Sequence, residues 1–239
     1  MGQPTLTVVA GPNGSGKTTL SLELQLIQPA NHLNADDFAR LRHLQTGQAL
    51  EDCERWAFAE VRRLQAGFIQ AQRSHSYETV LSHPDHVRRA LEAKRAGFHT
   101  RLIYIYLSNP DENVRRVASR FRSGGHNVPE DKIRARYARS LGLLRYAVAS
   151  FDSALVMTNE GKSPDKALDL IASGGLVQCR STLNRRIDEY SGSSDRWEDH
   201  GLFAGQSSGG WTEYCGDRSL LAQSKTELVH RRDGMLAGF

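Results

Sequence analysis

A glycine-rich loop, GPNGSGKTT, follows directly after the apolar run TLTVVA near the start of the chain. Its spacing fits the pattern G-x-x-x-x-G-K-[ST], in which glycines let successive backbone N–H groups point at phosphate oxygens. The helix expected to begin near Lys17 adds its positive N-terminal end. The alternative is a glycine-rich turn that binds nothing, but the strand pattern before the loop and the helical pattern after it favour a phosphate-binding loop.

The side chains of this loop have separate expected tasks. Lys17 can reach the β- and γ-phosphates of ATP or GTP, and the Thr18 hydroxyl can bind Mg²⁺. The residues expected to contact the nucleotide are Gly11, Pro12, Asn13, Gly14, Ser15, Gly16, Lys17, Thr18 and Thr19. The loop predicts nucleotide binding and leaves open whether the phosphate goes to water, to a shape change or to a second substrate.

Strand patterns alternate with helical patterns over the first three quarters of the chain. Strands are expected at TLTVVA, HLNADD, YETVLS, TRLIYIYL and ALVMTN, and a last helix is expected to begin at Ser163 and Pro164. This alternation predicts an α/β fold, a parallel sheet with helices on both faces. Ligands gather beyond the carboxyl ends of the strands in such folds. The residues that fall there, besides the loop, are Asp36, Asp37, Glu78 and Asn159.

The last quarter of the chain has a different composition. Residues 181–239 hold eight Ser and eight Gly without a sustained hydrophobic period, which is typical of loop or tail. We therefore divide the chain into a kinase-type domain, residues 1–178, and a Ser/Gly-rich tail, residues 179–239. Three cysteines without metal spacing, no apolar run long enough for a membrane span and no signal peptide predict a cytoplasmic protein without disulfides.

Positive charge is concentrated between residues 112 and 145, which hold nine Arg or Lys and three Asp or Glu. Arg116 and Arg120 lie one helical turn apart, and Arg134 and Arg136 belong to the next helix. The segment SGGHNVP between the two helices has the composition of a hinge. These features predict an arginine-rich helical lid over the nucleotide. A solvated basic surface is the alternative, and nucleic-acid binding is disfavoured because few aromatic residues are interleaved for base stacking.

A carboxylate at the end of the second strand is the expected partner of the nucleophile. Asp36 and Asp37 both qualify, since either could accept a proton from a substrate hydroxyl and help to hold Mg²⁺ through water. One of them could instead be the N-cap of the following helix. Glu78 is the third acid, with three open roles: binding substrate hydroxyls, binding a metal-bound water, or supporting the structure.

The segments GPNGSGKTT, NADDFAR, YETVLS, GFHTRLIYIYL and RVASRFRSGGHNVPEDKIRARYARSL together resemble the zeta-toxin family of bacterial P-loop kinases, in the branch often labelled predicted ATPases. The resemblance covers about residues 5 to 175. It implies a P-loop kinase fold and phosphorylation of the 3′-hydroxyl of the amino-sugar in UDP-N-acetylglucosamine, with ATP or GTP and Mg²⁺. It also implies a small helical antitoxin that blocks the nucleotide site.

The resemblance also assigns roles to single residues. The family's catalytic Asp aligns with Asp36, Glu78 matches an acid near the amino-sugar, and Arg120 matches a phosphate-binding arginine. A second family arginine falls near His126, where Arg134 or Arg136 could substitute or the imidazole could contact phosphate itself. The expected catalytic residues are Asp36, Lys17, Arg120 and Arg134, with Arg116 on the nucleotide. The expected acceptor-binding residues are Asp37, Glu78, Thr79, His126 and Arg136.

Two other functions are compatible with the loop. The same chemistry could act on another acceptor, such as a nucleotide, a dinucleotide cofactor or an aminoglycoside-like sugar. A regulatory or mechanical ATPase would need no acceptor. Against it, the strand TRLIYIYLSN ends without the acid of a strong Walker B strand, and no LSGGQ-like segment occurs.

Overall fold

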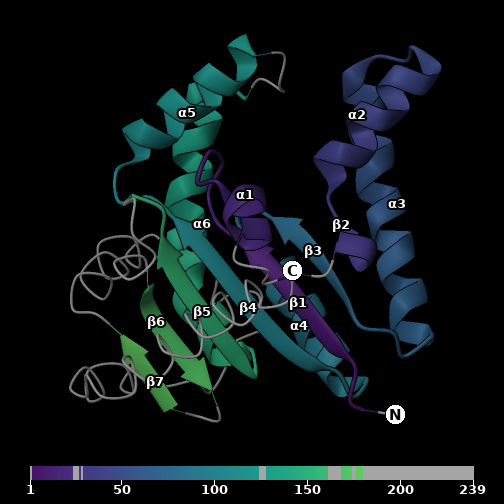
Figure 1. Cartoon of the computed structure of the whole chain (residues 1–239), viewed down its shortest axis with the longest axis vertical. Helices are drawn as coiled ribbons and strands as arrows, with labels where there is room; N and C mark the ends of the chain where they lie inside the picture. The colour runs from purple at the N-terminus through teal and green to yellow at the C-terminus, as the bar shows by residue number, and fades with distance from the viewer. Residues whose placement is uncertain are drawn as a thin grey trace, which may run out of the picture.

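A seven-stranded sheet forms the centre of the computed structural model (Figure 1). In spatial order its strands are β2 (His32–Leu33), β3 (His75–Thr79), β1 (Thr5–Ala10), β4 (His99–Tyr106), β5 (Ser153–Thr158), β6 (Leu168–Ser173) and β7 (Leu176–Cys179). The structure describes residues 2–23, 27, 29–123 and 128–160, and the backbone of 168–173 and 176–179. The first five strands in this order are parallel, so the predicted parallel sheet is confirmed.

The end of the sheet differs from the sequence prediction. β6 pairs with β5 and β7 pairs with β6, and both pairings are antiparallel. The helix predicted from Ser163 is therefore wrong from Leu168 onward, because an apolar run of this length suits a strand as well as a helix. Residues 161–167 and the predicted tail beyond Cys179 lie outside the described residues, so the division into domain and tail remains a prediction.

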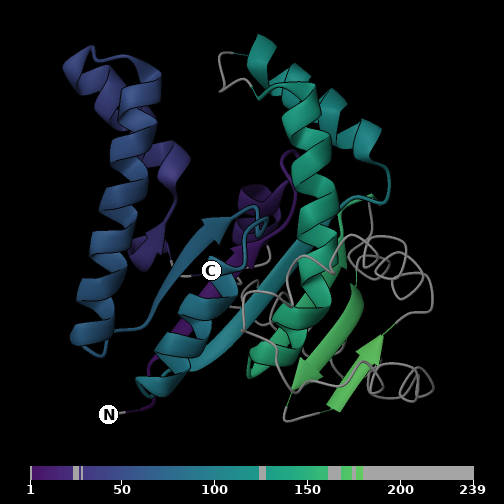
Figure 2. The ribbon, with the colours of Figure 1, turned by 180° about the vertical axis from the view of Figure 1, so that it is seen from behind.

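Helices cover both faces of this sheet (Figures 1 and 2), as predicted. α1 lies on one face and α4 and α6 lie on the other. The helices are α1 (Lys17–Glu23), a 3₁₀ turn η1 (Pro29–Asn31), α2 (Ala35–Thr46), α3 (Leu50–Gln70), α4 (Asp85–Arg95), α5 (Pro110–Arg122) and α6 (Glu130–Ser150). None of the helices in the described part of the chain is both long and apolar enough to cross a bilayer.

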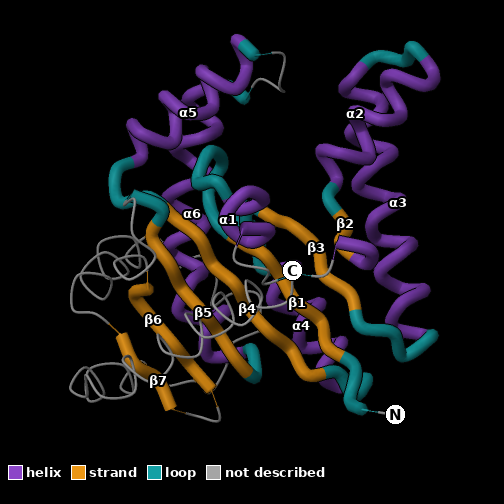
Figure 3. Tube along the Cα trace, viewed as in Figure 1, coloured by secondary structure: helices purple, strands orange, loops and turns teal. Residues whose placement is uncertain are grey.

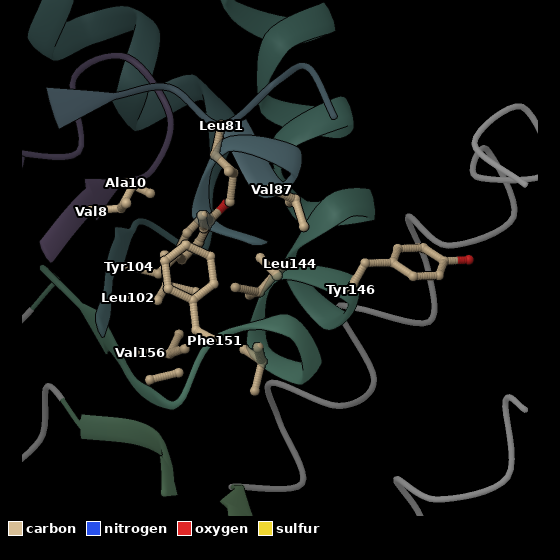
Figure 4. Close-up of a cluster of buried hydrophobic side chains, with 14 of the residues drawn as sticks. Val8, Ala10, Leu81, Val87, Leu102, Tyr104, Leu144, Tyr146, Phe151 and Val156 are labelled. Atoms are coloured by element: carbon tan, nitrogen blue, oxygen red, sulfur yellow. The ribbon is translucent and has the colours of Figure 1, made fainter. Parts of the chain in front are cut away.

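The main core lies between the sheet and the pair α4 and α6 (Figure 4). Alternate residues of β1 and β4, such as Val8 and Tyr104, point to this side and are fully buried. They meet apolar side chains of α6, including Leu144. The residues between them along the strands, such as Val9 and Ile103, form a smaller cluster on the opposite face. A strand buried on both faces explains why TRLIYIYL is continuously apolar.

Two helical pairs extend beyond the sheet on either side of the loop that precedes α1 (Figure 3). One pair is α2 and α3, which pack along each other, and the other is α5 and α6. Local sequence fixes where these helices begin. Asn109 caps α5 by accepting a hydrogen bond from the backbone N–H of Asp111, and Pro110 follows at the first helical position. The nucleotide loop therefore lies between two helical arms.

Candidate active site

The loop of residues 11–16 connects β1 to α1, and its glycines are required by close contacts. A Cβ on Gly11 would lie 1.8 Å from the carbonyl oxygen of Ile105 on the neighbouring strand. Gly16 has φ +79°, and a Cβ there would lie 2.4 Å from the side-chain nitrogen of Asn159. The predicted strand, loop and helix are all present, and the glycine spacing follows from packing of the loop against β4 and Asn159.

Lys17 is buried at the start of α1, with 8% of its surface exposed. Its ammonium group donates a hydrogen bond to the carbonyl oxygen of Pro12 at 3.0 Å and lies 3.9 Å from Oε1 of Glu78. Burial lowers the pKa of Lys17, while the negative charges of Glu78 and Asp36 raise it and the positive charge of Arg120 lowers it further. The charges of these three predicted site residues therefore act on one buried ammonium group.

Glu78 at the end of β3 is the centre of a polar cluster. Its Oε2 accepts hydrogen bonds from the Thr18 hydroxyl at 2.7 Å and from the Asn34 amide at 3.2 Å. The Nε2 atom of His32 lies 3.8 Å from the same oxygen. Burial alone would raise the pKa of Glu78, but His32, Lys17 and Thr18 together hold it below its usual value. Glu78 is thus ionised beside the hydroxyl that we expect to bind Mg²⁺.

The acidic pair of residues 36 and 37 lies in the first turn of α2. Asn34, and neither Asp36 nor Asp37, caps this helix, since its side-chain oxygen accepts a hydrogen bond from the backbone N–H of Asp36 at 3.0 Å. Both aspartates are exposed. Asp37 lies 3.9 Å from Arg40, whereas the Asp36 carboxylate forms no hydrogen bond or ion pair with a described side chain. The capping role considered for this pair belongs to Asn34, so neither carboxylate is used as the N-cap.

Arg116 and two asparagines hold the loop from the side of α5. The Asn159 amide donates to the carbonyl oxygen of Ser15 at 2.9 Å, and Arg116 donates to the Asn159 carbonyl at 3.1 Å. The Asn113 amide donates to the carbonyl oxygen of Asn13 at 2.6 Å. Sequence reasoning placed Asn159 at this end of the sheet but missed Asn113. The signal was a polar residue one turn before Val117, on the buried face of α5.

The remaining predicted arginines differ in their surroundings. Arg120 is exposed on α5, and its guanidinium has no hydrogen-bond or ion-pair partner among the described residues. Arg136 on α6 is half-buried and likewise has no such partner in that part of the chain. Arg134 forms ion pairs with Glu130 at 2.7 Å and Asp111 at 2.6 Å, so its charge is already balanced. His126, with the rest of the predicted hinge 124–127, lies outside the described residues.

Thr79 follows Glu78 but is engaged within its own loop. Its hydroxyl lies 3.0 Å from Nε2 of His86 and accepts a hydrogen bond from the backbone N–H of Leu81. Leu81 is fully buried with φ +56°, a left-handed conformation that costs a residue with a Cβ about 1–2 kcal/mol. The Ser140 hydroxyl donates to the carbonyl oxygen of Val80 and holds the turn from α6. Thr79 thus stabilises a strained turn beside the site.

The site has groups that suit a nucleotide and a hard cation. Asn13 Oδ1 and Ser15 Oγ are buried in the loop without a hydrogen-bond partner among the described residues. Such orphaned atoms are expected where a polar ligand belongs. The described residues contain no cluster of three His, Cys, Asp or Glu side chains that could hold a metal alone. Mg²⁺ needs no such cluster, because one or two oxygen ligands, phosphates and water suffice.

Comparisons with known proteins agree with this arrangement. A protein of Haemophilus influenzae described as uncharacterized is 28% identical over an alignment of 134 residues, and the match covers 53% of this chain and 88% of that protein. Among solved structures, the AvrRxo1-ORF1:AvrRxo1-ORF2 complex with sulphate ions aligns with a TM-score of 0.65 at 15% identity, covering 95% of this chain and 76% of that one. The PezAT chromosomal toxin–antitoxin system of Streptococcus pneumoniae aligns with a TM-score of 0.55 at 16% identity, covering 84% of this chain and 88% of that one.

At these identities the solved structures establish a shared fold. The family comes from the sequence itself: the pattern that defines the Zeta toxin family matches residues 1–163, which span the phosphate loop, β1–β5 and both helical arms. The resemblance noted in the sequence is therefore confirmed, and this chain belongs to the Zeta toxin family of P-loop kinases.

Proposed function

We propose that this chain transfers the γ-phosphate of ATP or GTP to a hydroxyl group of a nucleotide-sugar such as UDP-N-acetylglucosamine. The observation that carries the proposal is the meeting of a buried Lys17, an ionised Glu78 and an exposed, unpartnered Asp36 at one end of the sheet. Hydrolysis alone would need no free carboxylate on a separate arm. The arrangement suits a second substrate that enters between the loop and α2.

Four groups would act on the phosphate donor. The backbone N–H groups of the loop and the Lys17 ammonium would bind the β- and γ-phosphates. Mg²⁺, when bound, would neutralise phosphate charge, and the Thr18 hydroxyl and the Glu78 carboxylate are the oxygens placed to hold it directly or through water. Arg116 would support the nucleotide through its contact with Asn159. Arg120 would place positive charge on the transferred phosphoryl group.

Asp36 would act on the acceptor. Its carboxylate is free of partners, so it could accept the proton of the attacking hydroxyl and align that oxygen with the γ-phosphorus. Asp37 and Arg136 would contact the acceptor from the two arms. Arg134 would take part only if it left Asp111 and Glu130 when the site closes. We assign Arg134 and His126 the roles predicted from the sequence as part of this proposal.

We further propose that the chain is the toxin of a toxin–antitoxin pair, with a small helical antitoxin as partner and cytoplasmic nucleotide-sugar as target. Two considerations support this proposal: membership of the Zeta toxin family and a fold shared with the PezAT system. Induction of the chain in a bacterial host should arrest growth, and Asp36→Asn should relieve the arrest. Growth arrest by both forms alike would contradict a toxicity based on phosphoryl transfer.

The experiment that tests the enzyme incubates the chain with Mg-ATP and a panel of UDP-sugars and nucleotides, and mass spectrometry detects an added phosphate. Phosphorylation of one UDP-sugar, lost in Asp36→Asn and kept in the exposed control Asp52→Asn, is the expected result. ATP hydrolysis that ignores every acceptor and survives Asp36→Asn would indicate a regulatory ATPase instead. Phosphorylation of a nucleotide and of no sugar would support the kinase activity and contradict the proposed nucleotide-sugar acceptor.

A further inference from the structure

A cavity of about 330 Å³ lies between α3 and α4, against the early residues of β1 and β3. Its lining residues include Leu6, Ile69, Tyr77, Arg62 and Arg89, and none of those described belongs to the phosphate loop. Successive side chains of a strand point to opposite faces, so Tyr77 faces away from the side to which Glu78 points. The cavity is therefore separate from the candidate active site.

Two buried side chains in this lining each have one polar atom without a hydrogen-bond partner among the described residues. Tyr77 is 3% exposed, and its hydroxyl has no partner among the described residues. His75 is 4% exposed, and its Nε2 atom has no partner in that part of the chain either. Burial lowers the pKa of His75, so the ring is neutral, and its Nδ1 donates to the carbonyl oxygen of Arg73 at 3.1 Å. Nε2 is therefore left as a hydrogen-bond acceptor. Buried polar groups of this kind cost stability unless a ligand or water satisfies them.

The charges of the lining are also incompletely balanced. Its three arginines, Arg62, Arg88 and Arg89, outnumber its two acids, Asp85 and Glu92, by one. Arg88 binds both acids, and Arg62 lies 3.8 Å from Asp85. The Arg89 side chain is half-buried and forms no ion pair or hydrogen bond with a described residue; burial, followed by the charge of Arg62, lowers its pKa, and the charge of Asp85 offsets this only in part. A half-buried guanidinium without a direct ion pair is unfavourable in the ligand-free protein.

We propose that this cavity is a second ligand site, which binds a small carboxylate with an apolar body. The carboxylate would lie between Arg62 and Arg89 and accept the hydrogen of the Tyr77 hydroxyl. The apolar body would pack on Leu6 and Ile69, and a hydroxyl or N–H group at its far end would donate to Nε2 of His75. One negative charge matches the excess of one arginine, and the volume is at the lower end of the range for small-molecule sites.

Titration calorimetry on the full chain, with 4-hydroxybenzoate as the probe, tests the proposal. Saturable binding to one site is expected, with a dissociation constant near or below about 1 mM. Arg89→Gln should weaken it by about tenfold or more, whereas Arg95→Gln, which removes an exposed arginine from the same helix, should leave it unchanged. Absence of saturable binding, equal binding of 4-hydroxybenzamide, or equal losses in both variants would overturn the proposal. If inorganic phosphate bound as tightly as 4-hydroxybenzoate, the proposed contribution of the ligand's apolar body to binding would be refuted.

The melting temperature of the ligand-free protein provides a second test that does not depend on the choice of probe. If the unpartnered groups serve a ligand, removing them should raise the melting temperature of the ligand-free protein, as happens when binding groups are held without partners. Tyr77→Phe and Arg89→Gln are therefore expected to melt at higher temperature than the native chain. A lower melting temperature in both variants would show that these groups support the fold, and would contradict the proposed site. Neither result depends on kinase activity.

Discussion

Neutralising Glu78 should have opposite effects on the empty protein and on nucleotide binding. The Glu78 carboxylate lies 3.9 Å from the Lys17 ammonium, and their side chains are 14% and 9% exposed. Two unit charges at this distance attract each other by about 4 kcal/mol at an effective dielectric constant of about 20. Glu78→Gln also removes the cost of burying the carboxylate itself, which offsets part of the loss. We therefore expect the free energy of unfolding of the nucleotide-free protein to fall by about 2 kcal/mol.

The same substitution should strengthen the binding of ATP in the absence of Mg²⁺. The carboxylate repels the phosphates and balances the charge of Lys17, so its neutralisation makes Lys17 more attractive to a metal-free nucleotide. We expect the dissociation constant for ATP in EDTA to fall by about tenfold, equivalent to about 1.4 kcal/mol. With Mg²⁺ the advantage should disappear and turnover should drop, because one oxygen that holds the ion or its water is lost.

Urea unfolding and calorimetry with ATP, in EDTA and in Mg²⁺, measure both effects. Glu51→Gln, an exposed neutralisation on α3, is the matched control and should change neither quantity by more than a few tenths of a kcal/mol. If Glu78→Gln were as stable as this control and bound metal-free ATP no better than the native chain, Glu78 would neither balance Lys17 nor belong to the metal site. An unchanged turnover would refute the second role alone.

Three further substitutions test the phosphate loop and the turn that follows β3. Gly16→Ala should weaken ATP binding by about tenfold or more. The control is Gly47→Ala, with φ +68° and no atom within 4 Å of the added Cβ, which should cost only about 1 kcal/mol of stability. If the two variants bound ATP with equal affinity in a titration, the role given to Gly16 would be contradicted. Burial lowers the pKa of His86 to about 4, below the 6.5 of an exposed histidine, so the unfolded chain takes up the proton first as the pH falls. Between these pH values the free energy of unfolding of the native chain should fall by about 3 kcal/mol more than that of His86→Gln, as measured by urea unfolding, and parallel pH profiles would disprove the shift. Ser140→Ala leaves the buried Tyr104 hydroxyl without the hydrogen bond it forms at 2.8 Å, and should lower the free energy of unfolding by about 1–3 kcal/mol; a smaller loss in urea unfolding would mean that water replaces the serine.

Local sequence predicted the features whose causes are local. The phosphate loop follows from glycine spacing, and the parallel strands follow from apolar runs that alternate with helices. β6 and β7 could not be predicted in this way, because their strand form depends on the pairing of β6 with β5 and of β7 with β6, and not on a hydrophobic period of their own. The same holds for the cavity between α3 and α4, which is lined by residues of two helices and two strands that are far apart in the sequence.

The site residues likewise include some that local sequence could predict and some that depend on contacts between distant segments. Asn34 could have been recognised as the N-cap of α2, since asparagine two residues before an exposed acid is a local capping signal. The contact between Glu78 and Thr18 could not, because it requires β3 to pair with β1 and bring Val9 level with Glu78. Among the open roles of Glu78, its hydrogen bond to Thr18 favours the one beside the metal.

The residues proposed to bind the two substrates lie on parts of the fold that are held to the sheet to different degrees. The donor loop follows a central strand that is paired on both sides, whereas Asp36 lies at the start of α2, directly after the two-residue edge strand β2. Changes in the arm can thus reshape what is phosphorylated while leaving the source of the phosphate untouched. A scaffold divided in this manner lets related chains differ in their phosphate acceptor and keep the same phosphate donor.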